Sequence, residues 1–211
     1  MKPINILSDN INFDSTVVAL GFFDGVHIGH MELIGKMLTY AKTKNLPSII
    51  FTFDKSPKQV LNQDFDGYLT TPKEKFELLS EIGPEIVSYV PFTKDFAGLT
   101  KEAFVKEILI NRLKAQAVFV GFNFCYGANK SGNSEILKNE LSLYNRECHI
   151  IDPVKDENNL LISSSSIRQI VRNGDIPLAN NLLGRKLSFS GKVVHGDHRA
   201  TGMGFPSKSS A

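Results

Sequence analysis

Five short runs of apolar, β-branched and aromatic residues are spaced along the first three quarters of the chain. Runs of this kind, bounded by polar residues or glycine, are typical of strands that are buried on both faces. Helical patterns separate the runs, and this alternation predicts one parallel sheet joined by right-handed crossovers. The predicted strands are residues 16–21, 48–53, 85–90, 117–121 and 149–151.

Two of the intervening helices have clear start signals. Thr71-Pro72-Lys73-Glu74 combines a capping box with proline at the first helical position, and Gly83 marks the end of that helix. Thr100 begins another helix, whose apolar residues are spaced to cover one face as far as Leu113. Each of these helices leads into a predicted strand.

After Pro153 the elements become shorter. Four serines at 163–166 precede a short amphipathic helix, and a second short helix is predicted over 175–184. From 187 to 194 apolar and polar residues alternate, which predicts a strand near the C-terminal end of the chain.

Composition narrows the class of protein. The chain has 211 residues, 42% of them hydrophobic and 22% charged, with a formal net charge of +2, which predicts one main globular domain. Basic residues are scattered among acidic ones, so we expect no nucleic-acid partner. No run approaches the ~20 apolar residues of a membrane span. Cys125 and Cys148 lie far apart, which argues against a disulfide framework and favours a soluble, cytoplasmic protein.

The first candidate for chemistry is the segment from Gly21 to His30, which directly follows a predicted strand. Gly21 and Gly25 allow the backbone to approach a phosphate, and the free N–H groups of a helix that begins near Gly29 favour an anion. His27 and His30 add two donors on one side. In phosphoryl or adenylyl transfer, such donors suit stabilisation of the α-phosphate transition state and the departing pyrophosphate.

A His-x-x-His pair has other interpretations. The two histidines could simply lie half-exposed at a helix start, or they could bind zinc with Asp24 as a third ligand. A catalytic zinc needs three well-placed protein ligands, and nothing nearby secures them, so zinc ranks last. The position at the carboxyl end of the first strand favours a substrate site, because open parallel sheets bind ligands there.

The second candidate is Ser163-Ser164-Ser165-Ser166-Ile167-Arg168, at another helix start. Ser166 and Gln169 are expected to form the capping box, which explains one serine. The remaining hydroxyls and the helix N–H groups can receive the β and γ phosphates, and Arg168 offers a planar fork that matches phosphate oxygens.

The third candidate follows the strand at 117–121, where Phe122, Asn123 and Phe124 lie between two glycines. The aromatic rings could belong to the core, but the amide of Asn123 and the exposed backbone can also hydrogen-bond an adenine or isoalloxazine edge. Phe53 ends another strand in the same way and is a weaker candidate for contact with the second substrate.

Together these segments resemble the FMN adenylyltransferase module of the bacterial bifunctional riboflavin kinase/FAD synthetase family. Residues 21–30 resemble the first motif of that family, a variant of the His-x-Gly-His signature of the wider nucleotidyltransferase superfamily. The resemblance covers about residues 1–183, and its other segments follow in the family's order: Leu69-Thr70 with Glu74-Lys75 and Leu78-Leu79, Phe96-Ala97-Gly98-Leu99 with Phe104-Val105, Val120-Gly121-Phe122-Asn123-Phe124 with Gly127, and Ile162-Ser163-Ser164-Ser165 with Ile167-Arg168.

This resemblance implies a Rossmann-like parallel α/β sheet and transfer of the adenylyl group of ATP to FMN, with Mg²⁺, giving FAD and pyrophosphate. It implies catalytic roles for His27, His30 and Arg168 and names no metal-ligating residue. ATP binding is expected from Gly21, Phe22, Asp24, Gly25, His27, His30, Ser164, Ser165 and Arg168, and flavin binding from Phe53, Phe122, Asn123 and Phe124.

The chain also departs from the family's pattern. Lys55-Ser56-Pro57 stands where the family often has Pro-His-Pro, Lys130 stands where arginine is common, and Ser165 replaces the usual threonine while keeping the hydroxyl. These differences bear on the flavin contacts more than on the reaction.

From Leu183 to Pro206 the chain resembles the opening of the family's riboflavin kinase barrel. We expect residues 184–211 to be a truncated remnant that forms a short β-like tail. Closing a six-stranded barrel usually takes on the order of a hundred residues, so no riboflavin kinase activity is expected.

Two further functions compete with this interpretation. A related transferase with another acceptor, such as pantetheine phosphate or nicotinamide mononucleotide, would have a similar first motif. A non-catalytic flavin or nucleotide sensor would not need to keep His27, His30 and Arg168. The sequence leaves the oligomeric state open.

Overall fold

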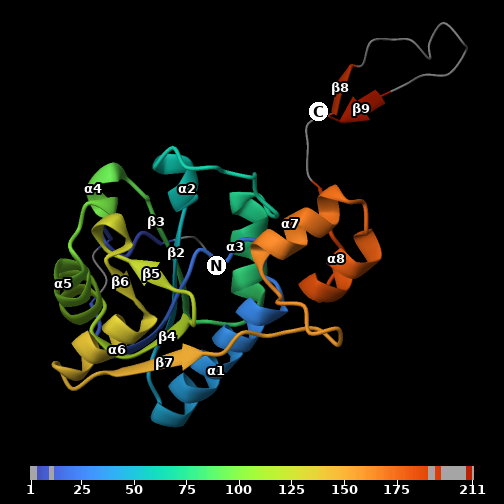
Figure 1. The fold of residues 1–211 in the computed structure, drawn as a ribbon. Coiled ribbons are helices and arrows are strands. Elements are labelled where there is room, and N and C mark those ends of the chain that lie inside the picture. Colours follow the sequence, from blue (N-terminus) through green and yellow to red (C-terminus); the bar gives the residue numbers. More distant parts are fainter. Residues whose placement is uncertain (1–3, 10–11, 190–192, 196–207, 211) are drawn as a thin grey trace, which may run out of the picture.

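A five-stranded parallel sheet forms the centre of the molecule in the computed structural model, which describes residues 4–9, 12–189, 193–195 and 208–210 (Figure 1). The strand order is β3-β2-β1-β4-β7, and all four pairs of neighbours are parallel. All five predicted strands are therefore confirmed. Their bounds are β1 Thr16–Leu20, β2 Ser48–Phe53, β3 Ile86–Val90, β4 Ala115–Gly121 and β7 Glu147–Ile151.

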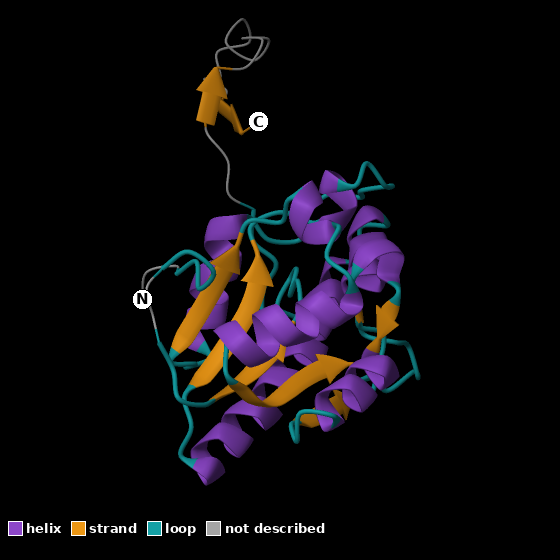
Figure 2. Cartoon of the chain, turned by 90° about the vertical axis from the view of Figure 1, so that its left-hand side faces the viewer, coloured by secondary structure: helices purple, strands orange, loops and turns teal. Residues whose placement is uncertain are grey.

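Helices lie on both faces of this sheet (Figures 1 and 2). The longest is α1 (Ile28–Lys44), which follows β1, and α7 and α8 pack on each other beyond the sheet. The other bounds are α2 Pro57–Val60, α3 Pro72–Glu81, α4 Lys94–Ala97, α5 Lys101–Ala103, α6 Ser134–Ser142, α7 Ser164–Arg172 and α8 Ile176–Leu183. A short hairpin of β5 (Cys125–Tyr126) and β6 (Gly132–Asn133) precedes α6, with a 3₁₀ turn at Ala128–Lys130 inside it.

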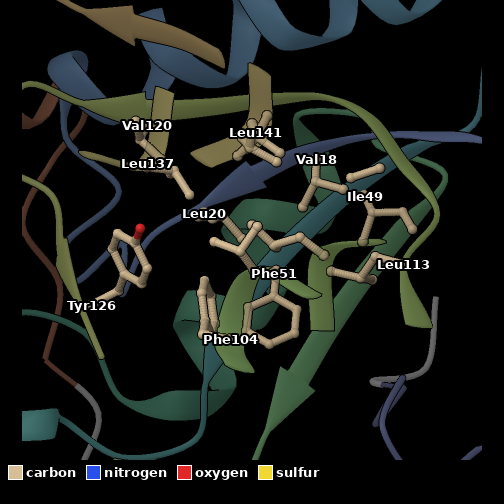
Figure 3. Packing of buried hydrophobic residues seen from close by; sticks show 14 of the residues in the cluster. Val18, Leu20, Ile49, Phe51, Phe104, Leu113, Val120, Tyr126, Leu137 and Leu141 are labelled. Atoms are coloured by element: carbon tan, nitrogen blue, oxygen red, sulfur yellow. The ribbon is translucent and has the colours of Figure 1, made fainter. Parts of the chain in front are cut away.

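The two faces of β1 build two separate cores, because successive strand residues point to opposite sides of a sheet. Val18 and Leu20 pack with Leu109 and with Leu137 of α6. Figure 3 shows Val18, Leu20 and Leu137 among the packed apolar side chains of this core. Val17 and Ala19 instead pack with residues of α1 and α3, among them Ile34, Met37 and Leu79. A third cluster joins α7 to α8 through Ile167, Ala179 and Leu182.

The strand order reverses beside β1, which pairs with β2 on one edge and with β4 on the other. The chain leaves β1 toward β2 on one side and later returns to β4 on the opposite side. In open parallel sheets, the loops diverge at such a switch point and leave a crevice at the carboxyl ends of the strands.

The helix predicted from Thr100 begins there, since the Thr100 hydroxyl accepts the N–H of Ala103 at 3.1 Å. Its second part, Phe104–Arg112, is a π-helix, where an α-helix was expected. The N–H of Leu113 donates to the carbonyl of Ile108, five residues back, at 2.8 Å. This wider hydrogen bonding still buries Phe104 and Leu109.

The capping box predicted from Ser166 and Gln169 is wrong, because α7 begins one turn earlier. Ser163 is its N-cap: the Ser163 hydroxyl accepts the N–H of Ser166 at 3.1 Å, and the Ser166 hydroxyl accepts the N–H of Ser163 at 3.0 Å. A serine at the third helical position thus makes the reciprocal bond that Glu or Gln usually makes.

The strand predicted over 187–194 is only partly correct. Residues 187–189 are in no strand, because the N–H of Leu187 donates to the side-chain oxygen of Asn180 at 2.6 Å. Residues 190–192 lie outside the described part of the chain. β8 (Val193–His195) pairs antiparallel with β9 (Lys208–Ser210) as a sheet of its own (Figure 1).

The capping box of α3 is confirmed and gives a first prediction. The Thr71 hydroxyl accepts the N–H of Glu74, and the Glu74 carboxylate accepts the N–H of Thr71 at 2.8 Å. Thr71→Ala should lower the free energy of unfolding by about 1 kcal/mol, measured by urea denaturation. Thr43→Ala, an exposed threonine inside α1, is the matched control and should be nearly neutral. Equal values for the two variants would contradict a role for the cap.

Candidate functional site

A cleft opens at the switch point, at the carboxyl ends of β1, β4 and β7, and has a volume of about 220 Å³. Four segments line it: the start of α1, the residues after β4, the residues after β7, and the start of α7. The lining includes His27 and His30, residues 121–123, residues 151–154, and Ser163 to Ser165. Two helix N-termini therefore border the same cleft.

The loop between β1 and α1 is shaped by unusual backbone angles. Phe23, Gly25 and Val26 have positive φ values of 55°, 79° and 39°. This conformation is costly for a β-branched residue such as Val26, and strain of this kind concentrates at functional sites. Gly21 has no room for a side chain, because an added Cβ would lie 2.6 Å from the ring of Phe23. This loop conformation places His27 directly before α1.

His27 is the N-cap of α1, and its ring stacks on the ring of His30 with centroids 3.6 Å apart. The Nδ1 atom of His27 accepts the backbone N–H of His30 at 3.4 Å. An accepting Nδ1 carries no proton in the neutral ring, so the His27 proton lies on Nε2. The Nδ1 atom of His30 is buried and has no hydrogen-bond partner among the described residues.

Both imidazoles are neutral at pH 7. Burial, with a smaller effect from the charge of Arg185, lowers the pKa of His27 from 6.5 to about 4. Burial also holds the pKa of His30 well below 6.5, and the protonated form of His27 and the charge of Lys75 act in the same direction. The pair therefore offers neutral N–H donors, not imidazolium cations, to a ligand.

Asp24 is a buried residue of this loop and connects three parts of the chain. Its carboxylate accepts the backbone N–H groups of Leu69 and Thr70 at 3.0 and 3.3 Å and forms a 2.7 Å ion pair with Arg168. Its carbonyl accepts the hydroxyl of Ser164 at 2.8 Å. Asp24 thus fixes the start of α7 against the loop after β1, and its carboxylate is already fully engaged.

The serines of the second motif divide into different roles. Ser163 and Ser166 form the helix cap, and Ser164 donates to Asp24. Ser165 lies in the cleft lining, and its Oγ is 3.4 Å from Nη2 of Arg168. Arg168 itself is outside the lining, with Nη1 on Asp24 and a buried Nε that has no partner among the described residues.

The predicted flavin residues do not all lie together. Phe122, 42% exposed, and Asn123 line the cleft, whereas Phe124 stacks on Tyr126 beside the β-hairpin. Phe53 lies at the end of β2, edge-on to Phe51, Phe92 and Phe96. The first two residues thus share the cleft lining with the histidines, and the other two belong to aromatic clusters outside it.

Two basic residues at the site received no role from the sequence. Lys75 is 1% exposed on the inner face of α3, one turn before the buried Leu79, and a lysine within an apolar helical stripe was a usable signal. Arg185 follows α8 and donates to the carbonyl of Val26 at 3.4 Å. Nothing in the sequence pattern points to Arg185, which reaches the loop only through the tertiary fold.

Zinc has no support in the described residues, which hold no group of three or more His, Cys, Asp or Glu side chains placed for a metal ion. Asp24, the proposed third ligand, is held by Arg168 and two amides. The only carboxylate among the described residues of the cleft lining is Asp152, after β7.

Within the described ranges, no helix combines the length and apolar character needed to cross a membrane.

Comparison with known proteins gives one matching family model, FAD synthetase, over residues 10–166. The chain is 35% identical over 193 residues to the bifunctional riboflavin kinase/FMN adenylyltransferase of Bacillus subtilis, covering 90% of this chain and 60% of that protein. It is 32% identical over 194 residues to the protein of the same name from Escherichia coli, covering 92% and 62%. The chain thus spans about three fifths of the length of these curated relatives.

A solved structure also matches closely. The crystal structure of a macrolide-efflux protein from Streptococcus pneumoniae is 33% identical, with a TM-score of 0.82, and the match covers 100% of this chain and 68% of that one. Because the match covers the entire chain, it includes the whole sheet and its helices.

The neutral histidines give a prediction for stability against pH. Because the pKa of His27 is lower in the folded state, the unfolded state binds more protons between pH 6.5 and about 4, and stability falls as the pH falls through this window. A pKa lowering of this size corresponds to a loss of roughly 3 kcal/mol at most in the free energy of unfolding. His27→Asn keeps a capping acceptor without a titrating ring, so urea unfolding should show a smaller loss between pH 6.5 and 4.

His149→Asn removes an imidazole on β7, away from the α1 start, and is the control for that measurement. It should keep the wild-type loss of stability. An unchanged loss in His27→Asn would contradict a buried, neutral His27.

Proposed function

The chain belongs to the FAD synthetase family, and we propose that it transfers the adenylyl group of ATP to the phosphate of FMN, giving FAD and pyrophosphate. One observation supports this proposal most: two neutral histidines and two helix N-termini border a single cleft at the switch point of a parallel sheet. That arrangement supplies hydrogen-bond donors and positive dipole ends where a triphosphate would lie.

In the proposed reaction, an oxygen of the FMN phosphate forms a bond to the α-phosphorus of ATP. The bond from the α-phosphorus to the α,β-bridging oxygen breaks, and pyrophosphate leaves with that electron pair. Negative charge spreads over the phosphate oxygens in the transition state. Nε2–H of His27, with His30 stacked beside it, would donate to those oxygens, so no covalent intermediate with the protein is needed.

The start of α7 would receive the leaving pyrophosphate. Ser165 borders the cleft, and Arg168 keeps Nη2 and Nε free of the Asp24 ion pair. Asp24 and Ser164 would then act mainly by holding α7 in place, and Gly21, Phe22 and Gly25 by shaping the loop.

The cleft lining fits a Mg²⁺ ion that arrives with the nucleotide. Mg²⁺ in such sites is bound largely by substrate phosphates with one or two carboxylates, and Asp152 of the cleft lining would provide one. When bound, the ion would neutralise charge on the phosphates. For the flavin, Phe122 and Asn123 line the same cleft as the histidines and would contact it there, and Phe53 and Phe124 would contact it from outside that lining.

We propose that residues 1–183 form the adenylyltransferase unit and that 184–211 are a separate segment of a cytoplasmic enzyme. The contact of Arg185 with Val26 favours extending the first unit by two residues.

The decisive experiment incubates the protein with ATP, Mg²⁺ and FMN and follows FAD and pyrophosphate by chromatography. FAD formation supports the proposal, whereas transfer only to pantetheine phosphate or nicotinamide mononucleotide would replace it with the related reaction.

The histidines should be required for that reaction. His27→Asn and His30→Gln should each slow FAD formation by about a hundredfold or more, because loss of one positioned donor to a transition state commonly costs ~3 kcal/mol. The rate at saturating ATP and FMN is the measurement, and His149→Asn is the control. Full activity in either variant would remove that histidine from the mechanism.

Arg168 should not be replaceable by lysine. Arg168→Lys cannot bind Asp24 and a phosphate with one planar fork, so the rate should fall by about tenfold or more, as expected for loss of a charge-assisted hydrogen bond. Arg172→Lys alters an exposed arginine one turn further along α7, paired with Asp66, and should leave the rate unchanged. Equal rates for the two variants would give Arg168 a structural role only.

A further inference from the structure

Lys75 of α3 occupies an unusual position for a lysine. Its ammonium group donates to the carbonyl of Phe53 at 2.8 Å and to the carbonyl of Phe22 at 3.0 Å, with the hydroxyl of Thr52 at 3.5 Å. It also lies 3.8 Å from the centre of the Phe22 ring and 5.1 Å from that of Tyr89. The side chain is almost completely buried.

These contacts continue the pairing of β1 and β2 where the backbone ladder stops. The register aligns Leu20 with Phe51, and the final backbone bond runs from the N–H of Gly21 to the carbonyl of Phe51 at 3.2 Å. Two residues beyond the pair Leu20 and Phe51, the ammonium group of Lys75 joins Phe22, after β1, to Phe53, the last residue of β2. The Thr52 hydroxyl of β2 also donates to the carbonyl of Phe22 at 3.0 Å. A side chain from α3, together with this hydroxyl, thus replaces a rung of the sheet at the point where the two loops separate.

The joined loops have different roles in the proposed reaction. The loop after β1 leads to His27 and His30, and the residue at the end of β2, Phe53, is a candidate for flavin contact. The distance between nucleotide and flavin therefore depends on the distance between these two loops. In transfer reactions, small errors in the position of the reacting atoms cause large losses of rate.

A buried ammonium group is costly, and no carboxylate among the described residues lies within ion-pair distance of Lys75. An apolar side chain of equal length would remove the cost of burying the ammonium group, and the carbonyl of Phe22 would keep the Thr52 hydroxyl as a donor at 3.0 Å. These effects oppose the loss of the two lysine hydrogen bonds, so we expect only a small change in the free energy of unfolding. A small net effect on stability leaves the position of the two joined loops as the main consequence of this lysine.

We propose that Lys75 is a positioning residue for adenylyl transfer, which ties the loop after β1 to the end of β2 so that ATP and FMN meet in line. This inference rests on the proposed function and adds a residue to it. Lys75 touches neither substrate; it acts through the carbonyls of Phe22 and Phe53.

The tie should also respond to pH. Burial lowers the pKa of Lys75 to about 7, and the nearby charges of Asp24 and Asp54 oppose that lowering. The other titratable groups that face it are His30 of α1, which is neutral, and Tyr89 of β3, whose pKa is raised by burial. Above pH 7 the ammonium form is lost and its bonds to two carbonyls weaken, so kcat/KM for FMN should fall as the pH rises from 7 to 8.5.

The test compares Lys75→Met with Lys73→Met, an exposed lysine on the same helix. For Lys75→Met we expect unfolding in urea at a concentration close to that of wild type, together with at least a tenfold lower kcat/KM for FMN and no fall between pH 7 and 8.5. ATP affinity, measured by calorimetry, should change less than threefold. Lys73→Met should match wild type in every measurement.

A wild-type rate in folded Lys75→Met overturns the proposal. If Lys75→Met does not fold, Lys75→Arg decides: its charge persists at pH 8.5, so we expect activity within tenfold of wild type at pH 6.5 and a flat profile above pH 7. A persistent fall between pH 7 and 8.5 in that variant overturns the proposal. If the wild-type protein itself forms no FAD, the proposed function fails and the role of Lys75 fails with it, whereas the outcomes above reject Lys75 alone.

Discussion

The buried carboxylate of Asp24 is the interaction on which the geometry of the cleft depends. It binds backbone amides of the segment before α3 and the guanidinium of Arg168 on α7, while its own carbonyl holds Ser164. The partners come from positions about 45 and 140 residues further along the chain. Because a buried carboxylate needs all of its hydrogen bonds, the three segments are fixed together and the starts of α1 and α7 border one cleft.

Burial also sets the chemistry of that cleft. The same desolvation that keeps His27 and His30 neutral strengthens each hydrogen bond that they can offer to a phosphate. Positive charge comes instead from Arg168 and Arg185, and from the buried Lys75 of α3, which donates to carbonyls at the ends of β1 and β2. The site therefore separates its donors from its cations, which suits a reaction that moves negative charge from one phosphate oxygen to another.

Local signals in the sequence predicted much of this arrangement. The five strands follow from apolar runs, and the capping box at Thr71 was correct because a cap involves only residues three positions apart. The cap of α7 was placed one turn too late, since four consecutive serines offer several local solutions and only the bond from Ser164 to Asp24 selects one. The π-helical turns after Phe104 have no local signal at all.

Short-range signals were enough to predict the parallel α/β sheet and to bring attention to the segments around His27 and Ser165, because periodicity and capping involve residues only a few positions apart. Only the tertiary structure decided that Asp24 pairs with Arg168, that Lys75 joins β1 to β2, and that Arg185 reaches the loop before α1. These contacts join residues 22 to 159 positions apart, and their energies depend on burial, which exists only once the chain has folded.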